Sequence, residues 1–303
     1  MAKFTVLSDL IEALAQHKRD VITSAQIAWR LCDFSLAEPE IIKSFTMSSG
    51  KGVDYLNRTL ATDFNNAQTR FVLKFAGVYA HQRPYVFRDA ANSSVHAGTN
   101  KTERCELADM AFLAVCVDQE KTVIAARASF FQAKKGEAID NETQRWLYDY
   151  DDKFKYQASS FWEHAACNSP DRTMPDWDEG RTSAFQYLIL SETHNAHVRL
   201  SPWNVCHRHA FGFFLYRLLT FAGGKDYRAS EITAGGWSSI VNDVLRMGNG
   251  AMSGVDRGSV DLDTIIDYFN DFRDHTVQNY DSRSSEGFPI VIAIVQDVGQ
   301  SGA

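Results

Sequence analysis

The sequence is poor in the residues that mark several large protein classes. Its 303 residues include only six prolines and eighteen glycines, too few for a collagen-like or linker-rich chain. The five cysteines are odd in number, widely spaced and without a CxxC pair, which argues against a disulfide framework. No apolar run approaches the roughly eighteen residues of a membrane-spanning helix. With 45% hydrophobic and 23% charged residues, the composition is that of one large or two small globular domains.

The start of the sequence carries no signal for secretion. Its first acid, Asp9, is reached before any apolar stretch long enough for the core of a signal peptide. Cysteine usage fits reduced thiols. We therefore expect a soluble cytoplasmic protein with no membrane partner.

Charge is distributed unevenly along the chain. The formal net charge of −7 is not typical of a protein that binds nucleic acid. Residues 66–104, however, contain six basic residues and two acids, whereas residues 137–180 contain eleven acids and four basic residues. Local fields guide a polyanion to a site more than net charge does, so the first of these segments is a candidate for contact with phosphates.

Hydrophobic periodicity predicts helices first and strands later. Apolar residues recur every three or four positions in three early segments, including a long amphipathic helix over residues 56–75. Residues 106–117 and 122–131 read as two buried strands joined by a turn at 118–121, which indicates an antiparallel hairpin. Further strands are expected at residues 183–190 and 288–295, and further helices at residues 142–154, 204–221, 237–247 and 262–272.

This order predicts an α/β (or α+β) protein with a central mixed sheet flanked by helices. Three regions follow from the pattern: an N-terminal helical region (1–76), a core (77–200), and a C-terminal helical region with a final strand (201–303), which is expected to pack on the core.

Four polar side chains stand out at the open end of the predicted hairpin. Glu106 and Asp109 begin its first strand, and Gln132 and Lys134 end its second. Pairing about the turn would place Asp109 across from about Phe130. Gln132 and Lys134, two residues apart, point to the same face of the sheet. Glu106 and Asp109 are three apart, so either a bulge intervenes or only one of them shares that face.

These residue types suit phosphoryl chemistry. Carboxylates are hard oxygen ligands for Mg²⁺, and a side-chain amide or a backbone carbonyl can complete the coordination. A lysine beside them can orient an attacking water and stabilise negative charge that develops on a phosphate.

The arrangement resembles the PD-(D/E)xK, or restriction-endonuclease-like, nuclease superfamily. The matching residues are Asp109 and then Gln132-Ala133-Lys134, with glutamine in place of the usual second acid. This Gln-x-Lys form is similar to nuclease domains of bacterial anti-phage effectors. The resemblance covers about residues 74–198 and implies a restriction-endonuclease-like core and a nuclease dependent on Mg²⁺ or Mn²⁺.

The resemblance also assigns roles to individual residues. Asp109 would be the principal metal ligand, Gln132 a weaker ligand through its side chain or backbone, and Glu106 a supporting acid. Lys134 would be the base on the water side or an electrostatic stabiliser. Four basic residues would contact phosphates: Lys135, Arg83, Arg88 and Arg127.

The function expected from this resemblance is hydrolysis of phosphodiester bonds, with DNA as the partner and anti-phage defence as the setting. A non-catalytic scaffold or nucleic-acid-binding subunit of a defence or repair complex, in which Gln132 marks lost catalysis, is an alternative. An RNA-cleaving toxin would use the same site. A homo-oligomer or a defence-complex partner is compatible with each of these interpretations. In the simplest alternative, Asp109 and Lys134 form an ordinary ion pair at a sheet edge and Gln132 is solvated.

A second set of candidate ligands, for zinc, lies within sixteen residues: His194, His197, Cys206, His207 and His209. Its spacing fits no common zinc finger. Local hydrogen bonding is the simpler interpretation of this segment.

Overall fold

The computed structural model describes residues 2–68, 70–80, 83–88, 104–138, 142–157, 166–167, 169–191, 193–249 and 288–299. Among these residues, eight strands form one mixed sheet in the order β1-β12-β4-β5-β8-β9-β10, with β11 paired to β5. The strands are β1 (Phe71–Ala80), β4 (Met110–Val117), β5 (Val123–Lys135), β8 (Phe185–Ser191), β9 (Asn195–Leu200), β10 (Arg208–Ala210), β11 (Lys225–Asp226) and β12 (Phe288–Asp297).

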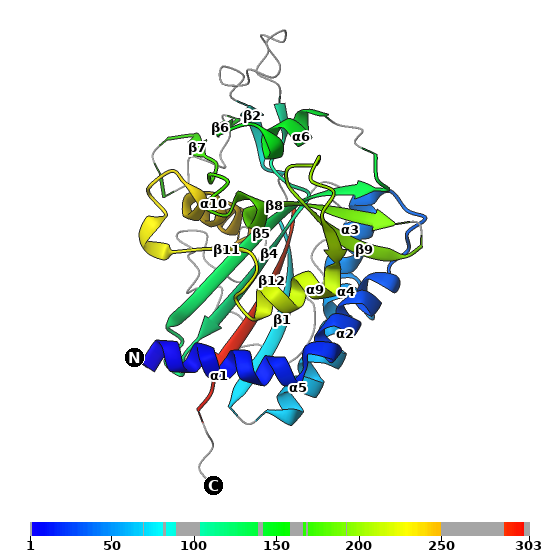
Figure 1. Cartoon of the computed structure of the whole chain (residues 1–303), viewed down its shortest axis with the longest axis vertical. Coiled ribbons are helices and arrows are strands. Elements are labelled where there is room, and N and C mark those ends of the chain that lie inside the picture. Colours follow the sequence, from blue (N-terminus) through cyan, green and yellow to red (C-terminus); the bar gives the residue numbers. More distant parts are fainter. Residues whose placement is uncertain are drawn as a thin grey trace.

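The order of strands confirms the predicted α/β class with a central mixed sheet flanked by helices. Strand β12 lies parallel to β4 and β5 lies parallel to β8, while the other neighbours are antiparallel. Both β4 and β12 are apolar along almost their whole length and buried on both faces, as expected of strands inside a sheet covered by two layers. Figure 1 shows β12 in red between β1 and β4, so residues far apart in the sequence share the middle of the sheet.

One face of the sheet is covered by the N-terminal helices and α9. They are α1 (Ala2–Gln16), α2 (Lys18–Arg30), α3 (Glu38–Met47), α4 (Gly52–Leu56), the π-helical turn η1 (Asn57–Ala61), α5 (Thr62–Ala67) and α9 (Phe211–Leu219). Aromatic rings fill this core: Trp29 stacks on Phe45 at 3.9 Å between ring centroids, and Phe112 contacts Phe211 at 5.3 Å. The apolar faces predicted for the first third of the chain are thus buried against the sheet.

The opposite face carries a second core. It is covered by α6 (Glu142–Asp149), α8 (Arg181–Ala184), the short 3₁₀ turn η3 (Ala229–Glu231) and α10 (Trp237–Asn249). A small antiparallel sheet joins this layer, in the order β3-β2-β6-β7. Its strands are β3 (Arg104–Glu106), β2 (Tyr85–Arg88), β6 (Lys153–Tyr156) and β7 (Asp171–Thr173). Figure 1 places this sheet and α6 together at one end of the molecule.

Several predicted boundaries are wrong. The helix expected over residues 56–75 ends at Ala67, and β1 begins at Phe71. Phe71, Leu73 and Phe75 are buried while the residues between them are only partly buried, so this stretch also has the two-residue period of a strand. A helix was predicted here because apolar residues continue at helical spacing beyond the end of the preceding helix.

Three other elements are shorter than predicted. The helix expected over residues 142–154 ends at Asp149 and is followed by β6, and the helix expected over residues 204–221 begins at Phe211 after β10. The strand at residues 183–190 is confirmed as β8, preceded by the short helix α8. The helix expected over residues 262–272 lies outside the described residues. No helix in the described part of the chain is long and apolar enough to span a membrane.

The hairpin of β4 and β5 is confirmed, but its register differs from the prediction. Met110 pairs with Phe131 rather than with about Ser129, because the strands shift by one residue between Cys116 and Val117 and the turn is not symmetric. Lys121 occupies the left-handed region with φ 64° within that turn. The shift moves Asp109 two residues along β5, toward Gln132 and Ala133.

Candidate functional site

Asp109 lies at the open end of the hairpin, one residue before β4. Its backbone N–H donates to the carbonyl of Phe131 at 2.8 Å, and its side-chain Oδ2 accepts the backbone N–H of Ala133 at 2.7 Å. The chain before Asp109 leaves the sheet, so it offers no backbone carbonyl to the N–H of Ala133 on β5. The Asp109 carboxylate accepts that N–H instead. Asp109 is half-buried, and this bond fixes it to the Gln132–Lys134 segment of β5.

Gln132 and Lys134 lie on β5 beneath α6. Gln132 is fully buried, and its Nε2 donates to the main-chain carbonyl of Gln144 at 2.7 Å. Lys134 is 5% exposed, and its Nζ donates to the side-chain Oε1 of Gln144 at 3.1 Å. One residue of α6 thus positions both side chains. The burial of Gln132 contradicts the alternative in which it is solvated at an ordinary sheet edge.

A third acid reaches the site from the N-terminal layer. Glu38 is the first residue of α3, and Pro39 follows it at a position where a helix has no N–H bond to lose. Its Oε2 accepts the backbone N–H of Lys135 at 2.9 Å, which ties the start of α3 to the end of β5. The carboxylate of Glu38 is therefore brought next to the strand end that carries Lys134.

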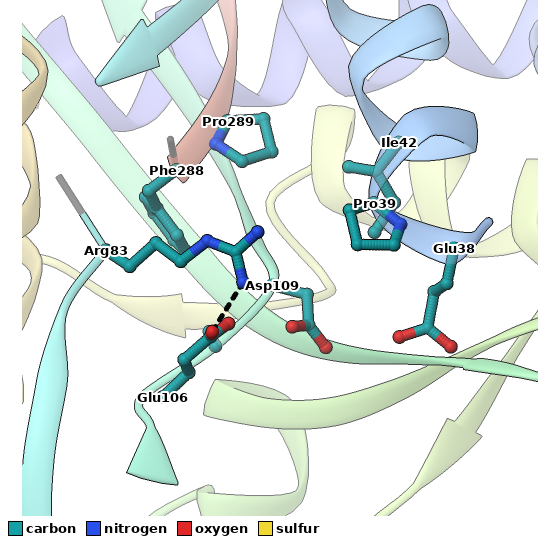
Figure 2. A pocket seen from close by; sticks show the side chains of 9 residues that line it. Glu38, Pro39, Ile42, Arg83, Glu106, Asp109, Phe288 and Pro289 are labelled. Carbon is teal, nitrogen blue, oxygen red and sulfur yellow. Dashed lines mark hydrogen bonds and ion pairs between the residues drawn. The ribbon is translucent and has the colours of Figure 1, made fainter. Parts of the chain in front are cut away.

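A small cavity of about 20 Å³ lies between these acids. It is lined by Glu38, Arg83, Glu106 and Asp109, with apolar walls that include Phe288 and Pro289 at the start of β12. Figure 2 shows the carboxylates of Glu38 and Asp109 turned toward the same gap, with Glu106 on the other side of Asp109. The volume suits one water molecule or one small ion.

The electrostatics of the cavity favour a cation. Burial is the largest influence on Asp109, and the nearby negative charge of Glu38 adds to it, so the pKa of Asp109 rises from 3.8 to about 8. Glu106 raises the pKa further, while the charge of Lys134 and the bond from Ala133 lower it. Two acids thus make ionisation of Asp109 costly, and a positive charge in the cavity would relieve that cost.

Glu106 is held apart from the hairpin. It ends β3 in the small sheet, where its Oε1 accepts hydrogen bonds from Arg83 at 2.5 Å and from the hydroxyl of Tyr85 at 3.3 Å. Glu106 and Asp109 therefore reach the cavity from different sheets, which answers the question raised by their three-residue spacing.

The four basic residues predicted to bind phosphates occupy different environments. Lys135 is exposed beside the cavity and donates to the carbonyl of Leu36 at 3.1 Å, and Arg83 is paired with Glu106. Arg88 is buried and paired with Asp151 at 2.5 Å.

The last of the four, Arg127, is paired with Asp226 at 2.7 Å and lies six residues before Ala133 on β5. At about 3.3 Å per residue this is roughly 20 Å from the cavity. Lys135 and Arg83 thus lie at the site, whereas Arg88 and Arg127 do not.

The donor set fits a small hard cation, although it does not form a full protein cage. No group of three or more His, Cys, Asp or Glu side chains in the described residues is arranged to hold a metal ion, and this includes the histidine-rich segment. Magnesium commonly uses one or two carboxylates and completes its shell with waters and substrate oxygens. Glu38 and Asp109 supply two carboxylates at the cavity, whereas Gln132 is not among the residues that line it, although its buried Oε1 has no hydrogen-bond partner among the described residues.

Three further residues lie at this candidate site and were not predicted from the sequence: Glu38, Gln144 and Tyr148. Gln144 and Tyr148 are one helical turn apart on α6. The charge of Asp109 adds to burial in raising the pKa of Tyr148 well above its ordinary value. A signal was present for Glu38, because an acid followed by proline marks the first turn of a helix. Nothing in the spacing along the chain, however, connects α3 or α6 with the hairpin.

Comparison with known proteins finds no relative from which a function could be inferred. No family model, no curated protein and no solved structure matches the chain.

Proposed function

We propose that the chain is a metal-dependent nuclease of the PD-(D/E)xK type that hydrolyses phosphodiester bonds, with DNA as the expected substrate. The observation that carries the proposal is the meeting of Asp109, Glu38 and the Gln132–Lys134 segment at one end of the β4–β5 hairpin. These groups come from three separate elements, and an isolated ion pair would not need all of them.

Each side chain has a role in this proposal. Asp109 and Glu38 would hold Mg²⁺, with water molecules completing its coordination. Bound there, the ion would supply Lewis-acid polarisation of a phosphoryl oxygen and a more acidic water ligand. Lys134, held by Gln144 at 3.1 Å, would place its ammonium group against negative charge that develops on the phosphate. Arg83 lines the cavity, and Lys135 is bound through its backbone N–H to Glu38, so both would contact neighbouring phosphates.

Cleavage of DNA in Mg²⁺ or Mn²⁺, supplied both as a plasmid and as a single-stranded oligonucleotide, tests this function. Asp109→Asn keeps the size of the side chain and removes its charge, and Lys134→Met keeps the length of the stem and removes the ammonium. We expect each variant to lower the cleavage rate by at least about 100-fold, the typical effect of removing one electrostatic stabiliser of a transition state.

The matched control is Glu120→Gln, an exposed acid in the turn at the other end of the same hairpin. It should cleave like wild type. Equal rates for wild type, Asp109→Asn and Lys134→Met would refute the proposed site.

A non-catalytic scaffold is the second candidate. It is favoured by Gln132, which occupies the position of the second acid and whose Nε2 is bound to the main chain of Gln144. Calorimetric titration with Mn²⁺ separates the two candidates. Binding that disappears in Asp109→Asn supports catalysis, whereas absence of binding together with absence of cleavage supports the scaffold.

A further inference from the structure

The small sheet turns one face away from the second core. Along each of its strands, buried residues alternate with residues that are exposed or half-buried. The buried set, which includes Val86, Cys105, Phe154 and Tyr156, belongs to the core beneath α6. We call the opposite set the outer face; it consists of Tyr85, Phe87, Arg104, Glu106, Lys153, Lys155, Asp171 and Thr173.

Aromatic rings and cations alternate across the middle of the outer face. Phe87 on β2 has Arg104 of β3 as its partner on one side and Lys155 of β6 on the other. The guanidinium of Arg104 lies over the ring of Tyr85, 3.7 Å from its centroid. The hydroxyl of Tyr85 donates to Glu106, which fixes the orientation of the ring. Flat π surfaces between cations suit the stacking of nucleobases with phosphates nearby.

The charge of the outer face differs from that of the whole chain. The chain carries a net charge of −7, whereas the outer face carries three exposed cations, Arg104, Lys153 and Lys155. Its two acids are Asp171 and Glu106, and the second of these is neutralised by Arg83. A polyanion would therefore meet a locally positive face, in contrast to the negative net charge of the chain.

The outer face leads directly to the candidate site. Tyr85 is the cross-strand partner of Glu106, and Glu106 lines the cavity together with Asp109 and Glu38. The backbone N–H of Leu107 donates to the carbonyl of Pro84, which holds the end of β3 against the start of β2. A nucleic-acid strand bound across Phe87 and Tyr85 would thus lie next to the cavity, because Glu106 both pairs with Tyr85 and lines the cavity.

We propose that the outer face is a binding platform for single-stranded nucleic acid, a site that rests on the proposed nuclease function and specifies its substrate. Stacking on the Phe87 ring and on the Arg104 guanidinium, which covers Tyr85, requires bases whose faces are not already covered by their neighbours in a duplex. The platform binds unpaired bases and directs the adjoining backbone to the cavity at Asp109.

Fluorescence anisotropy with a labelled oligonucleotide of about 16 nucleotides tests the platform. Binding of the full chain is measured with EDTA present, so that it does not depend on cleavage, and the same sequence is compared as a single strand and as a duplex. We expect the single strand to bind more tightly. Phe87→Ala should weaken that binding by at least about ten-fold, which lies within the range for loss of one stacked base.

Two further variants separate stacking from loss of structure. Phe87→Trp retains an aromatic face and should restore binding. Phe213→Ala removes an exposed aromatic ring on α9, outside the platform, and should leave binding unchanged. Lys155→Gln should reduce the dependence of binding on salt, because each phosphate contact releases counterions, whereas Arg19→Gln on α2 should not.

Three results would overturn the platform: no binding by wild type, duplex binding as tight as single-strand binding, or equal affinity of Phe87→Ala and wild type. Failure of the nuclease proposal is a separate outcome. In that case the oligonucleotide binds as expected but wild type does not cleave it in Mg²⁺ or Mn²⁺.

Discussion

At the residue scale, Asp109 is the point on which the site depends. It accepts the backbone N–H of Ala133 and shares a cavity with Glu38 and Glu106. A folded chain that buries a carboxyl group near two others favours its protonated form. The fold therefore stores an electrostatic cost at this residue, and that cost is what a bound cation would remove.

The stability of the protein should fall as pH rises, because of Asp109. Burial and the charge of Glu38 raise the pKa of Asp109 from 3.8 to about 8 in the folded chain. Between about pH 4 and pH 8 the folded chain holds a proton that the unfolded chain has released, so the free energy of unfolding decreases across this window.

Urea unfolding at pH 5 and pH 8.5 measures this effect. In Asp109→Asn the decrease should be smaller than in wild type by an amount on the order of 4 kcal/mol, because each of the roughly three pH units between pH 5 and the folded pKa contributes about 1.36 kcal/mol. Glu120→Gln serves as the control and should retain the wild-type dependence. A wild-type slope in Asp109→Asn would show that another group is responsible.

The sequence alone was sufficient to single out Asp109, Gln132 and Lys134 as candidates, because local pattern places them at strand ends. It could not find Glu38 or Gln144. Glu38 is 97 residues from Lys135, whose N–H it accepts. Its proximity arises from the packing of α3 on the sheet, and no periodicity along the chain encodes that packing. The burial of Arg88 was missed for the same reason, since its partner Asp151 belongs to a different segment.

At the element scale, α6 positions Gln144 against Gln132 and Lys134. Arg181 holds the end of this helix. Its Nε donates to the carbonyl of Tyr148 at 3.1 Å, and its Nη2 donates to the carbonyls of Leu147, at 3.2 Å, and Asp151. A helix end has unpaired carbonyls, and here one buried guanidinium satisfies several neighbouring groups at once.

Arg181→Met should therefore destabilise the protein and loosen α6. Arg181 is 1% exposed, so its removal leaves buried carbonyls without a donor. We expect the free energy of unfolding to fall by about 3 kcal/mol. Hydrogen exchange should increase in α6 before it increases in β5.

Arg228→Met provides the contrast. The Arg228 side chain is 61% exposed and paired with Glu231, so its loss should change stability by no more than about 0.5 kcal/mol. Similar losses for the two variants would contradict a specific role for Arg181.

Element types were easier to predict than element ends. The hairpin and its turn, β8, α10 and the final strand follow from strong local patterns. The helix expected over residues 56–75 failed because Phe71 and Phe75 fit both a helical step of four and a strand period of two. The hairpin register failed because a bulge between Cys116 and Val117 has no signature in the residues themselves.

At the scale of the whole molecule, the sheet is completed from both ends of the described chain. Strand β12 pairs with β1 over ten residues and with β4 over seven, and it separates two strands that would otherwise have open edges. The division into an N-terminal region, a core and a C-terminal region stays a prediction from the sequence. The hydrogen bonds of the sheet connect strands from all three regions.

Deletion of residues 288–303 should abolish cooperative unfolding. Without β12, both β1 and β4 lose a hydrogen-bonded neighbour, and seven buried apolar residues of the core are removed: Phe288, Ile290, Val291, Ile292, Ala293, Ile294 and Val295. Calorimetry should show a single transition for the full chain and none for the truncated one. Deletion of residues 301–303, which leaves β12 intact, is the control, and a cooperative transition in the longer deletion would show that β12 is dispensable.

The central position of β12 also has a consequence during protein synthesis. On the ribosome, β1 and β4 emerge long before the strand that must lie between them, so their backbone edges and apolar faces wait without a partner. Unpaired edges of this kind invite association with other nascent chains. The middle of the sheet can therefore reach its native strand pairing only after translation has passed residue 297.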